Sequence, residues 1–524
     1  MITTFLVLDR PLKTKWQVNY NEKLDKVRSV LRNEKDSLES LIMIDALQRL
    51  AIDYHFQDEI AVILSSIVAS HENFVDSDNS DLYNVSLGFR LLRQDGYHVC
   101  PDMFNKFKDA NGEFKQGLSE DLKGMMELYE ASHLGVVGES LLDEAQNFAL
   151  KNLKNALTHS TEDRARVITG TLKHPYYKSL ARFRAKHHIK NFEKKHGPRS
   201  DILQEFAKLD FNIVQSLHQR ELLEVSKWWK DLGLPKELRF ARNQPVKWYL
   251  SSMASLSDPR FLKQRIELVK PISFLYVLDD IFDVYGTLDD LIVLTEAFNK
   301  WDPTQIEQLP HQMKVFFKVV YDFTNEFSSK FFEKHGWNPS QSLQKSWGRL
   351  CNAFLAEAKW LASGELPSTE EYLKNGVIST GMEIVFVHTF FLLEQGITKE
   401  SVDLIDNVPG LITYTATILR LLDDLGSAKD ENQDGRDGSY IECYMKEHRS
   451  STIDDAREHV SCMISDAWKC LSEECLSPNI FSPSLRKASL DAARIISLIY
   501  DYDEDHHLPT LEEHIKSLLY ESIP

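Results

Sequence analysis

The sequence predicts an all-α protein built from two helical domains. Apolar residues recur every three or four positions, as in Leu41, Ile44, Leu47, Leu50 and Tyr54, which share one face of a helix. Alternating runs typical of β-strands are missing, and the interruptions are short stretches with glycine or proline. The same helical periodicity extends over residues 138–157, 203–230, 262–285, 313–333, 344–362, 411–429 and 485–500.

A chain of 524 residues is long enough for two or three domains. A basic, histidine-containing stretch ends at Gly197 and Pro198, and a long amphipathic helix follows it. We therefore expect a boundary near residue 205, with an N-terminal helical scaffold over residues 1–205 and a C-terminal domain over residues 206–524. No low-complexity linker separates them, so the two domains are expected to pack closely.

Composition argues against several classes of partner. The net charge of −18 repels phosphate backbones and anionic membranes, so no nucleic-acid partner is expected. The sequence has no run of about 18 apolar residues, so no membrane span is expected. The six cysteines are scattered without a CxxC pair, which indicates reduced thiols in an intracellular compartment. No signal or transit peptide is evident, so we expect a cytoplasmic protein, or a plastid protein if a leader was removed. We also expect a monomer.

The segment 271–285 combines an apolar helix with three carboxylates. Asp279 and Asp283 are four residues apart, which stacks them on one helical face about 6 Å apart, with Asp280 beside them. Burying unpaired carboxylates is costly, so they require cations or a water-filled cavity. Carboxylate oxygens suit Mg²⁺, which often takes one or two of them together with substrate phosphate oxygens. The alternative is a helix end that reaches solvent.

A second oxygen-rich stripe occurs in the segment 420–431. Asp423, Ser427 and Glu431 lie at i, i+4 and i+8, on one continuous helical face. Arg420, one turn earlier, could hold a phosphate oxygen through its planar guanidinium. Either stripe alone could be an ordinary solvated face. If the two helices face each other, the pair predicts a clamp for several Mg²⁺ ions on a diphosphate.

These residues resemble a known family. The stretches DDIFDVYG at 279–286 and DDLGSAKDE at 423–431 are similar to the DDxxD and (N/D)Dxx(S/T)xxxE metal motifs of plant class I terpene synthases. The likeness covers nearly the whole chain, because YHFQDEI at 54–60, LRFARNQPVKWY at 238–249 and EAKW at 357–360 also match. The resemblance implies a C-terminal class I α-bundle with an N-terminal α-barrel scaffold.

The resemblance also implies the roles of individual residues. Three Mg²⁺ ions, with Mn²⁺ as an alternative, would bind a prenyl diphosphate between Asp279, Asp280 and Asp283 on one side and Asp423, Ser427 and Glu431 on the other. The expected catalytic residues are Asp279, Asp283, Arg242, Arg420 and Tyr500, although Tyr500 could equally be a core tyrosine. The expected substrate-binding residues are Arg242, Arg420, Trp248, Ile272, Leu275, Tyr276, Ser379, Thr380, Gly381, Thr415, Ala416 and Asp505.

Three departures from the family pattern concern the product. The N-terminus lacks the RR and following Trp of many relatives, Gln244 replaces the second arginine of an Arg-x-Arg pair, and Ser251 replaces a pocket Trp. Arg239, one turn before Arg242, could compensate in part or be a surface residue. These features resemble the subfamily that makes the acyclic alcohols linalool and nerolidol. We therefore predict ionisation of geranyl or farnesyl diphosphate and capture of the allylic cation by water.

Three other functions fit parts of the sequence. A cyclising mono- or sesquiterpene synthase would share every metal ligand. A prenyl chain-elongating enzyme would carry a second DDxxD motif, whereas the 423–431 run has Ser and Glu at the ligand spacing. A non-catalytic helical scaffold would leave the carboxylates beside Phe274, Leu278 and Phe282 unexplained. No DxDD acid motif occurs in the N-terminal half, so cyclisation by alkene protonation is not expected.

Overall fold

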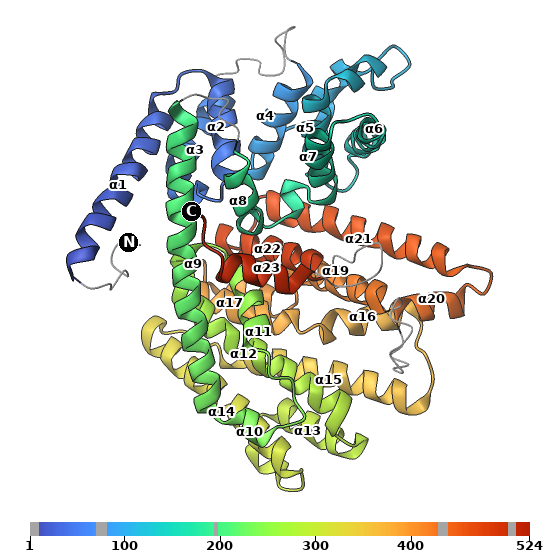
Figure 1. The fold of residues 1–524 in the computed structure, drawn as a ribbon. Helices are drawn as coiled ribbons and strands as arrows, with labels where there is room; N and C mark the ends of the chain where they lie inside the picture. Colours follow the sequence, from blue (N-terminus) through green and yellow to red (C-terminus); the bar gives the residue numbers. More distant parts are fainter. Residues whose placement is uncertain (1–9, 70–80, 193–197, 428–438, 501–509) are drawn as a thin grey trace.

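The computed structural model describes residues 10–69, 81–192, 198–427, 439–500 and 510–524. The secondary structure of these residues is helical, and the one strand-like feature among them is an isolated β-bridge between Lys108 and Phe114. The prediction of an all-α fold is confirmed. Figure 1 shows α1–α8 gathered in one half of the molecule and α10–α22 in the other, with α9 running along both.

The N-terminal half packs around two apolar cores. One core joins α1, α2, α3, α8 and the start of α9, and the other joins α4 to α7. The helices of this half are α1 Arg10–Asn33, α2 Ser37–Arg49, α3 Gln57–Ala69, α4 Leu82–Gln94, α5 Leu122–Ser132, α6 Ser140–Leu157, α7 Glu162–Lys173 and α8 Ala181–Lys190.

Helix α9, Pro198–Leu232, joins the two halves. Its 35 residues correspond to a length of about 50 Å. Phe206 and Phe211 of this helix are buried in the N-terminal half, whereas Val225 and Trp229 are buried in the C-terminal half. Because α9 continues without a break through residue 205, the domain boundary expected there stays a prediction.

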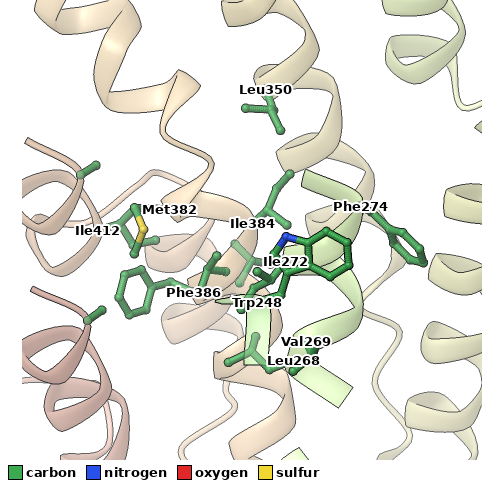
Figure 2. Close-up of a cluster of buried hydrophobic side chains, with 14 of the residues drawn as sticks. Trp248, Leu268, Val269, Ile272, Phe274, Leu350, Met382, Ile384, Phe386 and Ile412 are labelled. Carbon is green, nitrogen blue, oxygen red and sulfur yellow. The ribbon is translucent and has the colours of Figure 1, made fainter. Parts of the chain in front are cut away.

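The C-terminal half has one large core, part of which is shown in Figure 2. Trp248, Ile272, Met382, Ile384 and Ile412 belong to it and come from four different helices. The helices of this half are α10 Leu234–Glu237, α11 Pro245–Ser255, α12 Leu262–Asp280, α13 Leu288–Lys300, α14 His311–His335, α15 Ser340–Ser363, α16 Thr369–Ser379, α17 Met382–Leu393, α18 Lys399–Ile405, α19 Gly410–Ser427, α20 Tyr440–Glu447, α21 Ile453–Leu476, α22 Pro483–Ile499 and α23 Thr510–Leu519.

The end of α12 differs from the sequence prediction. The helix ends at Asp280, and the chain continues as a π-helical turn over Ile281–Tyr285, where the N–H of Gly286 donates to the carbonyl of Ile281 at 2.8 Å. The expected uninterrupted α-helix up to residue 285 is therefore wrong in its last turn. The α-helical spacing that placed Asp283 directly above Asp279 does not apply to this wider turn, which is a geometry that recurs at functional sites.

One stretch of the described residues, Thr369–Leu393, has the length and composition of a membrane span, with a mean hydropathy of 1.7. However, 78% of its most apolar window is buried inside the protein. It also comprises two helices, α16 and α17, which meet at Gly381. These features are those of a buried core helix pair, and they make this stretch weak evidence for a membrane span.

Candidate active site

The loop before α11 holds Arg242 against the end of α12. The guanidinium of Arg242 pairs with Asp279, and its Nε lies 2.8 Å from an oxygen of Asp280. The backbone N–H of Arg242 donates to the other Asp280 oxygen at 2.6 Å. Since both oxygens of the buried Asp280 contact Arg242, we infer that this carboxylate positions the arginine. A metal-binding role for Asp280 stays a prediction.

Burial and the neighbouring Arg242 have opposite effects on the pKa of Asp279. Its side chain is 29% exposed, and that of Arg242 is 37% exposed. Burial raises the pKa of Asp279, and the neighbouring Arg242 offsets this only in part. Asp283, on the π-helical turn, is exposed. The first predicted stripe therefore presents one half-buried carboxylate and one exposed carboxylate at the same end of α12.

The second predicted stripe lies at the end of α19. Arg420 Nη1 lies 3.6 Å from Asp423 and 3.7 Å from Asp424. Asp424 is buried and accepts hydrogen bonds from the Tyr372 hydroxyl and from the Tyr440 N–H, both at 2.9 Å. Asp423 keeps 40% of its side chain exposed, so it is the carboxylate of this pair that remains accessible.

Three predicted residues lie wholly or in part outside the described structure. Ser427 is the last residue of α19, and its side chain lies outside the described part of the structure. Glu431 and Asp505 also lie outside the described residues. Their predicted roles stay predictions.

The two stripes flank the same region. Helix α17 packs against both α12 and α19. Burial raises the pKa of Tyr276, and Asp279 and Asp423 act in the same direction, so its hydroxyl lies within electrostatic reach of both carboxylates. Burial likewise raises the pKa of Glu357 on α15, where Arg420 lowers it and Asp279 raises it. These shared interactions are consistent with two metal stripes that face each other.

The donor set fits Mg²⁺. Within the described ranges no three His, Cys, Asp or Glu side chains converge on one point. Mg²⁺ does not require such a cage, because it is commonly held by one or two carboxylates, substrate phosphate oxygens and water. Asp279 and Asp423 offer partly exposed oxygens, and burial raises the pKa of Asp279 although Arg242 opposes the shift. A divalent cation beside Asp279 would favour its charged form.

Helices α16 and α17 meet at a junction that falls on three of the expected substrate-binding residues, Ser379, Thr380 and Gly381. Gly381 has a φ of +70°, a backbone conformation that residues other than glycine rarely adopt. A Cβ at this position would also overlap the Cδ1 atom of Leu275 on α12. Both the backbone and the neighbouring helix therefore require glycine here. Leu275 and Tyr276 are partly exposed next to the junction, whereas Ile272 is buried one turn earlier.

Other predicted pocket residues lie deeper in the core. Trp248 and Ala416 are fully buried, and the Trp248 ring lies 6.3 Å from the Tyr276 ring. The hydroxyl of Thr415 donates to the Leu411 carbonyl at 2.9 Å and lies 3.1 Å from the hydroxyl of Ser489 on α22. The structure thus places this hydroxyl in the contact between α19 and α22. Substrate contact by these residues stays a prediction.

Two further predicted positions lie at the edges of the site. Tyr500 caps the end of α22 and packs at the margin of the large core. Arg239 is exposed and lines, together with Arg242, a cavity of about 200 Å³ beside the arginine loop. The placement of Arg239 leaves its suggested compensating role as a prediction.

Sequence reasoning assigned no role to two residues that the structure brings into this region. Glu357 accepts a hydrogen bond from the Ser379 hydroxyl at 2.6 Å. Tyr372 bonds to Asp424, as described above. Glu357 could have been found from its place in the EAKW stretch, but a tyrosine at ordinary helical core spacing gives no comparable signal.

Comparisons with known proteins identify the family of the chain. The chain matches the sequence model described as "Terpene synthase family, metal binding domain" over residues 230–470, and "Terpene synthase, N-terminal domain" over residues 7–174. It is 52% identical to probable terpene synthase 13 of Ricinus communis over 95% of this chain and 87% of the relative.

Two further relatives carry more specific names. The chain is 50% identical to an (E)-nerolidol synthase of Cannabis sativa, over 95% of this chain and 91% of that protein. It is 44% identical to the chloroplastic S-(+)-linalool synthase of Arabidopsis thaliana, over 97% of this chain and 89% of that protein.

Solved structures show the same architecture. A limonene synthase with 2-fluorolinalyl diphosphate aligns with a TM-score of 0.92 at 33% identity, over 98% of this chain and 95% of that one. The isoprene synthase of grey poplar, in complex with three Mg²⁺ ions and dimethylallyl-S-thiolodiphosphate, aligns with a TM-score of 0.89 at 33% identity, over 96% and 97% of the two chains.

Proposed function

The chain belongs to the plant terpene synthase family, and from this premise we propose that it converts geranyl or farnesyl diphosphate into an acyclic tertiary alcohol, linalool or nerolidol. The observation that carries the proposal is the pair of arginine–carboxylate groups, Arg242 with Asp279 and Arg420 with Asp423. Their carboxylates lie at the ends of α12 and α19, two helices that pack against α17. Each group combines a cation for phosphate oxygens with a partly exposed carboxylate for a metal.

In this mechanism Asp279, Asp283 and Asp423 would hold Mg²⁺, together with Ser427 and Glu431. Bound Mg²⁺ would neutralise charge on the departing diphosphate as a Lewis acid, and Mn²⁺ is an alternative ion. Arg242 and Arg420 would orient the diphosphate, because planar guanidinium groups form paired hydrogen bonds with phosphate oxygens. Both arginines already lie beside the carboxylates, so they are placed before substrate enters.

The apolar side chains would hold the allylic cation. The aromatic face of Tyr276, partly exposed beside Asp279, could stabilise positive charge on the prenyl chain. Leu275 and the junction at Gly381 would shape the pocket next to it. Exclusion of bulk water would limit side reactions, while one admitted water would add at the internal allylic carbon and lose a proton to the released diphosphate.

The alcohol product is supported by sequence features and by relatives. Gln244 and Ser251 depart from the usual family pattern, and the Ser251 hydroxyl donates to the Lys247 carbonyl one turn earlier, at 3.4 Å. The nerolidol and linalool synthases described above are among the more similar proteins. A cyclising synthase is the second candidate, favoured by the close structural likeness to limonene synthase.

The test is an assay of the purified protein with geranyl and farnesyl diphosphate and Mg²⁺. We expect linalool and nerolidol as the main products on a chiral gas-chromatography column, with no consumption of isopentenyl diphosphate. Mostly cyclic hydrocarbons would select the second candidate. No diphosphate release from either substrate would refute both.

The compartment and assembly state are separate proposals. We propose that the enzyme acts as a monomer, which size-exclusion chromatography with light scattering tests. The cytoplasmic location expected from the sequence competes with a plastid location, and the chloroplastic linalool synthase relative supports the latter. Fluorescent fusion of the full open reading frame distinguishes the two compartments.

A further inference from the structure

One face of α16 packs against the end of α19. Tyr372, Gly376 and Ser379 lie at i, i+4 and i+7, so they share this face. Each of the three touches Arg420 or the neighbouring Asp424, as the following contacts show. We call these three residues the α16 face.

Gly376 receives the stem of Arg420. A Cβ at this position would lie 3.0 Å from Cγ and 3.2 Å from Nε of the arginine. These distances are shorter than ordinary van der Waals contact, so the arginine stem lies directly against the bare helix backbone. The backbone of Gly376 is not in the left-handed region, so its conformation does not itself require glycine. Glycine is required at position 376 because the stem of Arg420 occupies the space of a side chain.

The two hydroxyls on the α16 face hold the ends of the same group. The Ser379 hydroxyl donates to Glu357 at 2.6 Å and accepts from Nη2 of Arg420 at 3.2 Å. The Tyr372 hydroxyl donates to Asp424, which in turn lies 3.7 Å from Arg420 Nη1. The guanidinium is thereby fixed from both sides.

We propose that the α16 face positions Arg420 for the diphosphate, with Gly376 and Tyr372 as positioning residues of the reaction. This inference rests on the proposed function, in which Arg420 binds the leaving diphosphate. It adds that the arginine is held from a different helix, the one that ends at the α16–α17 junction. A shift of that junction would therefore move the arginine as well.

Gly376→Ala tests this directly, because its effects on stability and on binding should have opposite signs. Alanine favours a helix over glycine, so the thermal midpoint should stay the same or rise. The displaced arginine should weaken binding of inorganic pyrophosphate about tenfold, measured by isothermal titration calorimetry with Mg²⁺. KM for the prenyl diphosphate should rise in parallel.

Gly170→Ala is the matched control. Gly170 is also a helical glycine beside an arginine, since its Cβ would lie 3.3 Å from a guanidinium nitrogen of Arg184, but it lies on α7 of the N-terminal half. This variant should bind pyrophosphate like the wild type. Equal weakening in both variants, or unchanged pyrophosphate binding in Gly376→Ala, would overturn the proposal.

A double-mutant cycle removes the remaining structural explanation. In an Arg420→Ala background, Gly376→Ala should have no further effect on pyrophosphate affinity, because the displaced group is gone. Tyr372→Phe keeps the ring and should weaken pyrophosphate binding about threefold. An additive effect of Gly376→Ala in the Arg420→Ala background would contradict the positioning role. Because calorimetry does not require turnover, failure of the proposed product chemistry would leave these outcomes readable.

Discussion

The two halves of the molecule each contain a cluster of arginines and carboxylates, and the clusters differ in how completely they are paired. In the N-terminal half, Arg90 pairs with Asp45 and Glu127, and Arg49 pairs with Asp45 at 2.9 Å. Burial by itself would raise the pKa of Asp45, but the two arginines outweigh it and lower the pKa to about 2. The charge of Asp45 is therefore compensated within this cluster, although burial still raises the pKa of the neighbouring Glu130.

The cluster in the C-terminal half is left partly unsatisfied. Burial raises the pKa of Asp279, and Arg242 does not reverse the shift. Asp279, Arg242 and Asp423 keep between about a quarter and two-fifths of their side chains exposed, whereas Arg90 is fully buried. We therefore propose that the same residue types hold helices together where they neutralise each other, and bind ligands where they still lack a cation or an anion.

Asp279→Asn should give the largest effect on activity. Asparagine keeps the shape but loses the charge that would hold Mg²⁺, so kcat/KM should fall about 10²- to 10³-fold. Stability should be unchanged or slightly higher, because the buried charge is removed. Steady-state assays over a range of Mg²⁺ concentrations, with thermal unfolding alongside, measure both. A fall in thermal stability with activity preserved would show that Asp279 has a structural role and does not hold the metal.

Arg90→Met should show the reverse pattern. It leaves Asp45 and Glu127 buried without their main cation, which should cost about 3–5 kcal/mol of stability. The kcat of the protein that remains folded should stay near the wild-type value. Chemical denaturation followed by circular dichroism measures the loss. A variant of normal stability would show that the ion pairs of Arg90 do not stabilise the packing of the N-terminal helices.

Gly381→Ala should disturb the junction beside the C-terminal cluster. The left-handed backbone and the overlap with Leu275 together should cost about 1–3 kcal/mol. Combining it with Leu275→Ala removes the overlap but keeps the backbone strain, so part of the loss should remain. Unfolding curves of the two single variants and the double variant separate these contributions. Complete recovery in the double variant would mean that strain at residue 381 is negligible.

Glu383→Gln should give the smallest effect, and one that depends on pH. Burial raises the pKa of Glu383 to about 7, although Arg349 opposes the shift. The folded state then keeps its proton longer than the unfolded state, so the wild type loses stability as pH rises from about 4.5 to 7. The variant should exceed the wild type by on the order of 1 kcal/mol at pH 8. Melting curves at several pH values should show this gap closing near pH 4.5.

The sequence by itself determined what depends on local spacing. Helical periodicity located most helices and the absence of strands, and the spacing of Asp279, Asp283 and Asp423 pointed to carboxylates in apolar helices. These signals survive in the sequence because a helix repeats every 3.6 residues whatever packs against it.

Only the tertiary structure decided which partner each face receives. Nothing in the spacing shows that Asp280 is occupied by Arg242, that Thr415 faces α22, or that α12 ends in a π-helical turn. The contact of Arg420 with Gly376 joins residues 44 positions apart in the sequence, at a glycine whose own conformation is ordinary. Such choices depend on how distant helices pack, and that information is not carried by the period of any single helix.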